Sequence, residues 1–192
     1  MLNNMHSDSP VDLEDEGIIS TPLKWLWITF VVIFIDQITK WTAESSLVLL
    51  SDPGGKSYPV FEHLNFTLAY NYGAAFSFLS DQGGWQRWFF TILAAIVSII
   101  ILIWMSKLKP SEKWTAISLS LVLGGAIGNL IDRVLYGRVI DFIDVYADWD
   151  VFFLSKWPDG FHHFATFNIA DIAINIGAII LVVGSFFIKD EA

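Results

Sequence analysis

Residues Gly124–Asp144 read GGAIGNLIDRVLYGRVIDFID, and residues Phe164–Gly177 read FATFNIADIAINIG. Each segment continues or opens a run apolar enough to cross a bilayer, yet each carries carboxylates and carboxamides. A charged side chain at the centre of a membrane helix costs about 2.5–3.5 kcal/mol on insertion scales, so such residues usually face a bundle interior and serve a function. The two segments therefore predict a membrane protein with a polar site between its helices.

The composition agrees with an integral membrane protein. Of 192 residues, 54% are hydrophobic, and the mean hydropathy of +0.54 exceeds that of a soluble domain. The net charge is −9, and part of the acidic excess lies in residues 1–22, which we expect to form a flexible tail. No basic patch indicates nucleic acid or anionic lipid as a ligand. The absence of cysteine excludes disulfides, thiolate nucleophiles and Cys-ligated metals.

Residues 23–192 are expected to form one membrane domain. A membrane helix needs about 20 residues, and four runs are apolar enough, at about 23–41, 87–105, 115–135 and 169–188. Four crossings place both ends of this domain on one side of the membrane. Lysine and arginine occur on both sides, so the positive-inside rule does not fix the orientation. Gly124 and Gly128 allow a close helix contact in the third span.

The loop 42–86 contains the signals of a small sheet at the membrane surface. Turn residues occupy 51–55, and β-favouring runs follow at Tyr58–Phe61 and Leu64–Tyr70. Gly55-Lys-Ser57 resembles the end of a phosphate-binding loop, but Leu50 stands where that motif requires its first glycine. Nucleotide binding is therefore not predicted.

The second long loop, 136–168, is rich in aromatic residues between 145 and 163. Aromatic rings favour the bilayer interface, so an aromatic belt is preferred over a cofactor site. We expect His162 and His163 to be surface or interfacial residues.

The first span carries Asp36, Thr39 and Lys40 at i, i+3 and i+4, which is one face of a helix near the membrane boundary. We expect Lys40 to extend its ammonium group to the interface. For Asp36 the spacing fits an interfacial position and a functional role equally well.

Two further sets of polar residues follow helical spacing and reach one membrane depth if their spans are antiparallel. The sets are Asn129, Asp132 and Arg133, followed by Asp141, and then Asn168, Asp171 and Asn175. Two carboxylates about 4 Å apart at an effective dielectric constant near 20 repel each other by about 4 kcal/mol. Such a pair would share one proton.

A carboxylate pair with one shared proton is what an aspartic protease uses, one as base on a water and the other as acid. Serine chemistry fits less well because all four histidines lie outside the spans and no Gly-x-Ser-x-Gly turn exists. Zinc chemistry lacks a His-Glu-x-x-His motif, and neither a metal nor a cofactor is expected. Spacing alone leaves open which aspartates form the pair.

Two other functions use similar residues. A small proton- or ion-coupled carrier also needs buried Asp and Asn pairs, although these aspartates cluster near one membrane surface and no pair of broken helices is evident. A non-catalytic assembly or chaperone subunit would tolerate Asp171→Asn.

Five motifs follow one another along the chain: Asp36-Gln-Ile-Thr-Lys40, Asn71-Tyr-Gly-Ala-Ala-Phe76, Gly124-Gly-Ala-Ile-Gly-Asn-Leu-Ile-Asp-Arg133, Val139-Ile-Asp-Phe142 and Phe167-Asn-Ile-Ala-Asp171. In this order they resemble the bacterial lipoprotein signal peptidases, the signal peptidase II family, over residues 36–177.

The resemblance implies that Asp141 and Asp171 are the catalytic pair and that Asp132 is a supporting residue paired with Arg133. Other residues of the motifs would position the pair or line the substrate groove. The supporting set is Asp36, Asn71, Gly73, Asn129, Asp132, Arg133, Asn168 and Ala170.

The resemblance also implies the fold, the substrate and the location. The fold would be an all-α membrane protein, a bundle of four transmembrane helices with a small β-cradle and a short surface helix outside the cytoplasm. The substrate would be a prolipoprotein, cleaved just before a diacylglyceryl-modified cysteine near the outer face of the inner membrane. Both termini would be cytoplasmic, the protein monomeric, and a globomycin-type lipopeptide its inhibitor. The stretch between Asp141 and Asn168 is long for the family.

Overall fold

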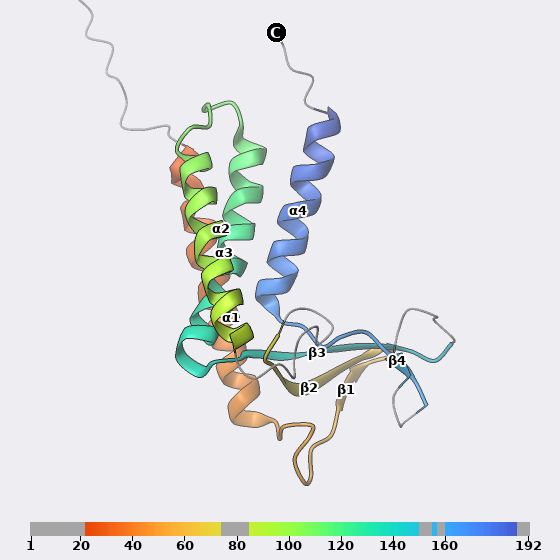
Figure 1. Ribbon diagram of the computed structural model, residues 1–192. Coiled ribbons are helices and arrows are strands. Elements are labelled where there is room, and N and C mark those ends of the chain that lie inside the picture. The colour runs from red at the N-terminus through yellow and green to blue at the C-terminus, as the bar shows by residue number, and fades with distance from the viewer. Residues whose placement is uncertain (1–21, 74–84, 150–154, 157–159, 188–192) are drawn as a thin grey trace, which may run out of the picture.

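The computed structural model describes residues 22–73, 85–149, 155–156 and 160–187. Within them, four long helices run side by side and an antiparallel sheet lies across one end of the bundle (Figure 1). The beginning of the first helical segment and the end of the last helix both lie at the opposite end of the bundle (Figure 1). The expected tail at residues 1–21 and the expected short surface helix, which would fall within 74–84, lie outside the described residues.

The four helices match the four predicted spans. They are α1 (Leu26–Ser46), which continues the 3₁₀ helix η1 (Pro22–Trp25), α2 (Trp85–Met105), α3 (Lys113–Tyr136) and α4 (Ile169–Phe187). All four are long and apolar enough to cross a membrane. The main difference is at α1, which was expected to end near 41 and instead reaches Ser46. Pro22 is buried in η1 and is therefore not part of a flexible tail.

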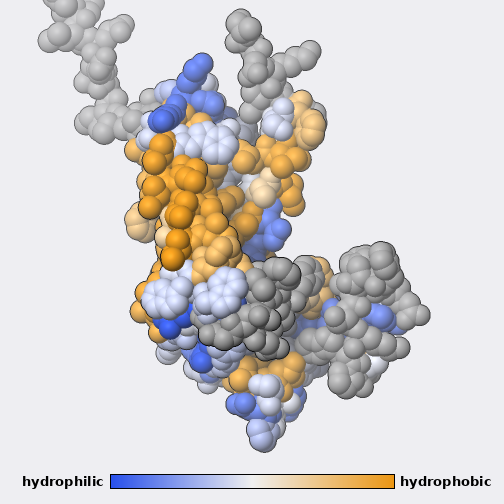
Figure 2. All heavy atoms as spheres, in the orientation of Figure 1, coloured by the Kyte–Doolittle hydropathy of each residue, from blue (hydrophilic) through white to orange (hydrophobic). Residues whose placement is uncertain are grey.

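Helix α3 is the centre of the bundle. In its apolar 18-residue window 56% of the residues are buried, against 17% in the corresponding window of each of the other three helices. The outer helices expose large apolar side chains, such as Phe30 at 72% and Ile179 at 61%, and hydrophobic residues cover the visible helical surface (Figure 2). An apolar surface of this extent suits contact with lipid.

Glycines let α1 and α4 approach α3 closely, as the small residues of this helix predict. A Cβ atom added to Gly124 would lie 2.7 Å from Cβ of Val32 on α1. One added to Gly125 would overlap the backbone carbonyl oxygen of Ala170 on α4. The neighbouring helices therefore occupy the space that a side chain would fill.

In the described part of the chain, the sheet has five strands in the order β1-β2-β3-β5-β4. They are β1 (Tyr58–Phe61), β2 (Leu64–Asn71), β3 (Val139–Ala147), β4 (Ser155–Lys156) and β5 (His162–His163). The first two strands confirm the β-favouring runs of the loop 42–86. The other three come from the loop 136–168, for which no strand was predicted.

Strand β3 begins directly after α3. Gly137 ends that helix in the left-handed conformation (φ 73°), which glycine adopts without a Cβ penalty. β3 then pairs with β2, and Asp141 lies opposite Ala69. Asp141 is thus carried by a strand, whereas the sequence led us to expect two acidic side chains meeting across neighbouring membrane helices.

Candidate active site

Asp141 and Asp171 are joined by the side chain of Asn168, the residue before α4. Asn168 Nδ2 donates to Asp141 Oδ1 over 2.6 Å. Asn168 Oδ1 accepts from the Asp171 backbone N–H over 3.0 Å, and the Asn168 backbone N–H donates to Asp171 Oδ2 over 3.2 Å. This reciprocal pair is a capping box, which satisfies two N–H groups at the start of the helix. The helix start and the alignment of the two aspartates therefore depend on one asparagine.

Asn129 on α3 is the third contact of this pair. Its Nδ2 donates to Asp171 Oδ1 over 2.9 Å, and its Oδ1 accepts from Asn168 Nδ2 over 3.2 Å. Both oxygens of Asp171 thus accept hydrogen bonds.

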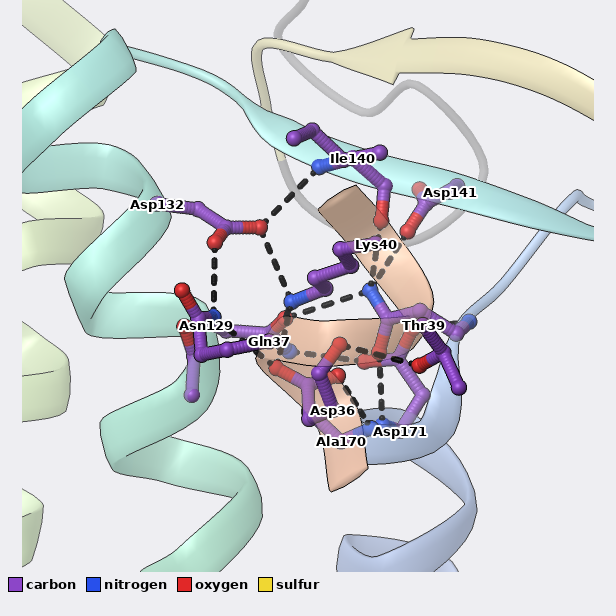
Figure 3. Close-up of polar contacts among 12 residues, drawn as sticks. Asp36, Gln37, Thr39, Lys40, Asn129, Asp132, Ile140, Asp141, Ala170 and Asp171 are labelled. Atoms are coloured by element: carbon purple, nitrogen blue, oxygen red, sulfur yellow. Dashed lines mark hydrogen bonds and ion pairs between the residues drawn. The ribbon is translucent and has the colours of Figure 1, made fainter. Parts of the chain in front are cut away.

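Lys40 lies directly behind Asn129 and is 1% exposed. Its ammonium group contacts Asp36 Oδ2 at 2.9 Å, Asp132 Oδ2 at 2.8 Å and Asn129 Oδ1 at 2.9 Å (Figure 3). These contacts match its three N–H donors. The expectation that Lys40 extends to the interface is therefore wrong, because two buried carboxylates on different helices hold it inside.

The two carboxylates that bind Lys40 also fix the neighbouring backbone. Asp36 Oδ1 accepts from the Ala170 N–H over 2.9 Å in the first turn of α4, where negative charge is favourable. Asp132 Oδ2 accepts from the Ile140 N–H over 3.1 Å, next to Asp141 on β3 (Figure 3). One buried ionic cluster thus ties α1, α3, α4 and β3 together.

Arg133 does not form the expected pair with Asp132, which binds Lys40 instead. Arg133 donates to the backbone oxygens of Asn129 (3.3 Å) and Gly73 (3.2 Å). The side chain of Asn71 accepts from the Gly73 N–H over 3.0 Å and also hydrogen-bonds to Asp141. Asn71, Gly73 and Arg133 therefore come together beside the aspartates.

A cavity of about 530 Å³ opens beside this cluster. The polar residues that line it include Asn71, Asn129, Arg133 and Asp171. Its apolar wall comes from the segment before α4 and from the helix itself, including Phe164, Phe167, Ile172 and Ile176. Asp171 is half-buried and lines the cavity, whereas Asp141 is 2% exposed and hydrogen-bonds to Asn71 and Asn168.

Burial and, to a smaller extent, the negative charge of Asp171 raise the pKa of Asp141, which is about 7. Hydrogen bonds from Asn71 and Asn168 oppose this shift but do not cancel it. With this pKa, Asp141 is protonated in a large fraction of molecules near neutral pH.

His163 is not a surface residue as expected, since it is 3% exposed. Its Nδ1 lies 2.6 Å from Oδ1 of Asp144, which is fully buried. The contact joins β5 to β3 and could not be read from sequence spacing. His162, by contrast, is only half-buried.

The chain matches the family model described as Signal peptidase (SPase) II over residues 28–187. The lipoprotein signal peptidase of Hydrogenovibrio crunogenus is 46% identical over 172 residues, covering 88% of this chain and 89% of that protein. The lipoprotein signal peptidase of Acinetobacter baumannii is 46% identical over 169 residues, covering 88% of this chain and 86% of that protein. The lipoprotein signal peptidase of Shigella boydii is 45% identical over 172 residues, covering 89% of this chain and 94% of that protein.

Two solved structures of bacterial membrane enzymes have the same fold. One superposes with a TM-score of 0.69 at 31% identity and covers 88% of this chain and 93% of its own. The other has a TM-score of 0.65 at 32% identity and covers 87% of this chain and 94% of its own.

Proposed function

The chain belongs to the signal peptidase II family, and from this premise we propose that it cleaves by an aspartic mechanism with Asp141 and Asp171 as the catalytic pair. Family membership makes it a bacterial membrane protease whose substrates are prolipoproteins. The observation that carries the proposal is the hydrogen bonding of both aspartates to Asn168 beside the cavity.

The two carboxyl groups have environments that suit opposite roles. Asp171 reaches the cavity and accepts hydrogen bonds on both oxygens, so it acts as the base that removes a proton from a water. Asp141, with its raised pKa, holds the proton that the reaction needs.

The chemistry balances with these two groups and one water. The water oxygen bonds to the scissile carbonyl carbon as its proton passes to Asp171, and Asp141 gives its proton to the carbonyl oxygen. The resulting tetrahedral intermediate collapses as one of its two hydroxyl groups returns a proton to Asp141, the C–N bond breaks, and the leaving amine takes the proton from Asp171. Arg133, Asn71 and Gly73 line the approach and position the peptide.

We further propose the site of cleavage and the location of the enzyme. The scissile bond is the one just before a cysteine that carries a diacylglyceryl group. The protein lies in the inner membrane, with its site near the outer face and both termini in the cytoplasm. Residues 23–192 form a single peptidase domain that works as a monomer without a cofactor, and residues 1–22 contribute nothing to catalysis.

The position of the aspartates supports a peptidase better than a carrier. They lie where the helices meet the sheet, at one end of the bundle (Figures 1 and 3). A carrier site is typical of the middle of the bilayer. A lipidated signal helix could reach the cavity sideways from the membrane.

The test uses purified protein in lipid bilayers with a diacylglyceryl-modified precursor and the same precursor unmodified. Asp141→Asn and Asp171→Asn should each abolish cleavage while leaving a folded protein, and Asp148→Asn, at an exposed position, is the matched control. Wild-type enzyme should cut only the modified precursor and be inhibited by a globomycin-type lipopeptide. Full cleavage by either dyad variant would overturn the aspartic mechanism.

A further inference from the structure

Asn175 is a polar residue on the lipid-facing side of α4. It is exposed, and its apolar neighbours along this side, such as Ile179 and Val182, are 61% and 56% exposed. It also lines the cavity, one turn beyond Asp171 on the same helix. Asn175 therefore stands at the edge where the cavity meets the hydrocarbon.

The hydrogen bonds of Asn175 leave part of its carboxamide available. Its Nδ2 donates to the Asp171 backbone oxygen over 2.8 Å, which uses one of two N–H groups. Among the described residues, no acceptor forms a hydrogen bond with its second N–H. An amide donor without a partner in hydrocarbon is costly, so its presence at the cavity edge calls for an acceptor on the ligand.

Ser185 shows that a polar residue on α4 need not have this property. Its hydroxyl has a single proton, and it donates to the Val182 backbone oxygen over 2.7 Å. Its donor is thus satisfied within the helix. Ser185 is also absent from the residues that line the cavity.

We infer that Asn175 determines specificity by donating its second N–H to an ester carbonyl oxygen of the substrate's diacylglyceryl group. The inference rests on the proposed function, because that function places lipid esters a few bonds from the scissile peptide. An ester carbonyl accepts hydrogen bonds and donates none, which matches the free donor. The apolar wall with Phe167 and Ile176 would contact the first part of the acyl chains.

The test compares two precursor peptides that differ only in the lipid. One carries dipalmitoylglyceryl, with two ester carbonyls, and the other carries dihexadecylglyceryl, whose ether links have none. Wild-type enzyme should prefer the ester, and Asn175→Leu should reduce kcat/KM for the ester by about twofold to tenfold, the range for one neutral hydrogen bond. The same variant should leave the ether unchanged.

A second variant separates substrate contact from helix structure. In Asn175→Thr, the single hydroxyl proton can replace the bond to the Asp171 oxygen, which leaves no donor for the ester. It should therefore behave like Asn175→Leu, and Ser185→Ala should behave like wild type with both lipids.

Equal losses on ester and ether, or full recovery by Asn175→Thr, would assign Asn175 a purely structural role and overturn the inference. No loss in any variant would do the same. The proposed function fails on other results: wild-type enzyme that cuts unmodified precursor as well as modified precursor, or full cleavage by Asp141→Asn or Asp171→Asn. The two failures are therefore distinguishable.

Discussion

Lys40 and Asn129 are joined by a hydrogen bond of 2.9 Å from the ammonium group to the side-chain oxygen. This contact fixes which end of the carboxamide faces which neighbour. Because the oxygen faces Lys40, the nitrogen is directed at Asp171, to which it donates over 2.9 Å. A lysine on α1 thus orients the donor that holds a proposed catalytic aspartate on α4.

The first prediction concerns Lys40→Met, which removes the positive charge between Asp36 and Asp132. Breaking a buried ion pair by deleting one partner costs about 3–5 kcal/mol, since a buried charge is left uncompensated. Thermal unfolding in detergent should show this loss at neutral pH. Lys24→Met, at an exposed lysine of the same helical segment, should change little. Equal stability of Lys40→Met and wild type would contradict the ionic cluster.

The sequence predicted the spans and the first hairpin because their signals are local. Long apolar runs mark the helices, and β-favouring residues between turns mark β1 and β2. The capping box of Asn168 and Asp171 is also readable, as Asn-x-x-Asp before an apolar run.

Other contacts depend on partners distant in sequence. Lys40 was misplaced because its spacing from Asp36 does not reveal that Asp132 on α3 completes the cluster. The pairing of His163 with Asp144 requires the register of β5 on β3, which no local pattern encodes.

The second prediction is a decline of activity with alkaline pH. If protonated Asp141 is the acid, its raised pKa of about 7 means that the active form is lost as pH rises through neutrality. We expect kcat/KM for a lipidated precursor to fall toward tenfold per pH unit above this value. Initial rates between pH 5 and 9 in bilayers would measure it. If kcat/KM instead increased as the pH rises through 7, Asp141 would act as a base and not as the acid.

The third prediction concerns stability, because the pKa of Asp141 is about 7 when folded and near 3.9 when unfolded. Between these values the folded state binds more protons, so stability falls as pH rises. The pKa difference corresponds to about 4 kcal/mol across the window. Asp141→Asn removes this dependence, so it should be more stable than wild type at pH 8 and similar to it near pH 4. Denaturant titrations at both pH values, with Asp148→Asn as control, test this sign. If the free energy of unfolding of Asp141→Asn and of wild type changed equally with pH, the predicted destabilisation by ionised Asp141 would be contradicted.

The fourth prediction is that Gly125→Ala impairs catalysis although it replaces no polar side chain. The added Cβ would overlap the Ala170 backbone oxygen and lie 2.7 Å from Ile174 Cγ1, so α4 must move away from α3. Overpacking of this kind costs about 1–3 kcal/mol, and it should separate Asn129 from Asp171. Cleavage rate and thermal stability should both fall. Ala178→Val, at an exposed position of α4, should leave both unchanged, and an active Gly125→Ala enzyme would show that the helices are not held in close contact.

The fifth prediction concerns His163→Phe, which leaves the buried Asp144 without its 2.6 Å contact. Asn65 Nδ2 at 3.1 Å and Thr67 Oγ1 at 3.3 Å still donate to the other oxygen of Asp144, so the sheet should persist but weaken. The cost should be about 1–3 kcal/mol for the unpaired group, and backbone amides of β3 and β5 should exchange with solvent faster. Hydrogen exchange monitored by mass spectrometry would locate the change. The control is His162→Phe, because adjacent strand residues face opposite sides of a sheet. If both variants accelerated exchange equally, the contact between His163 and Asp144 would not be what holds β5 against β3.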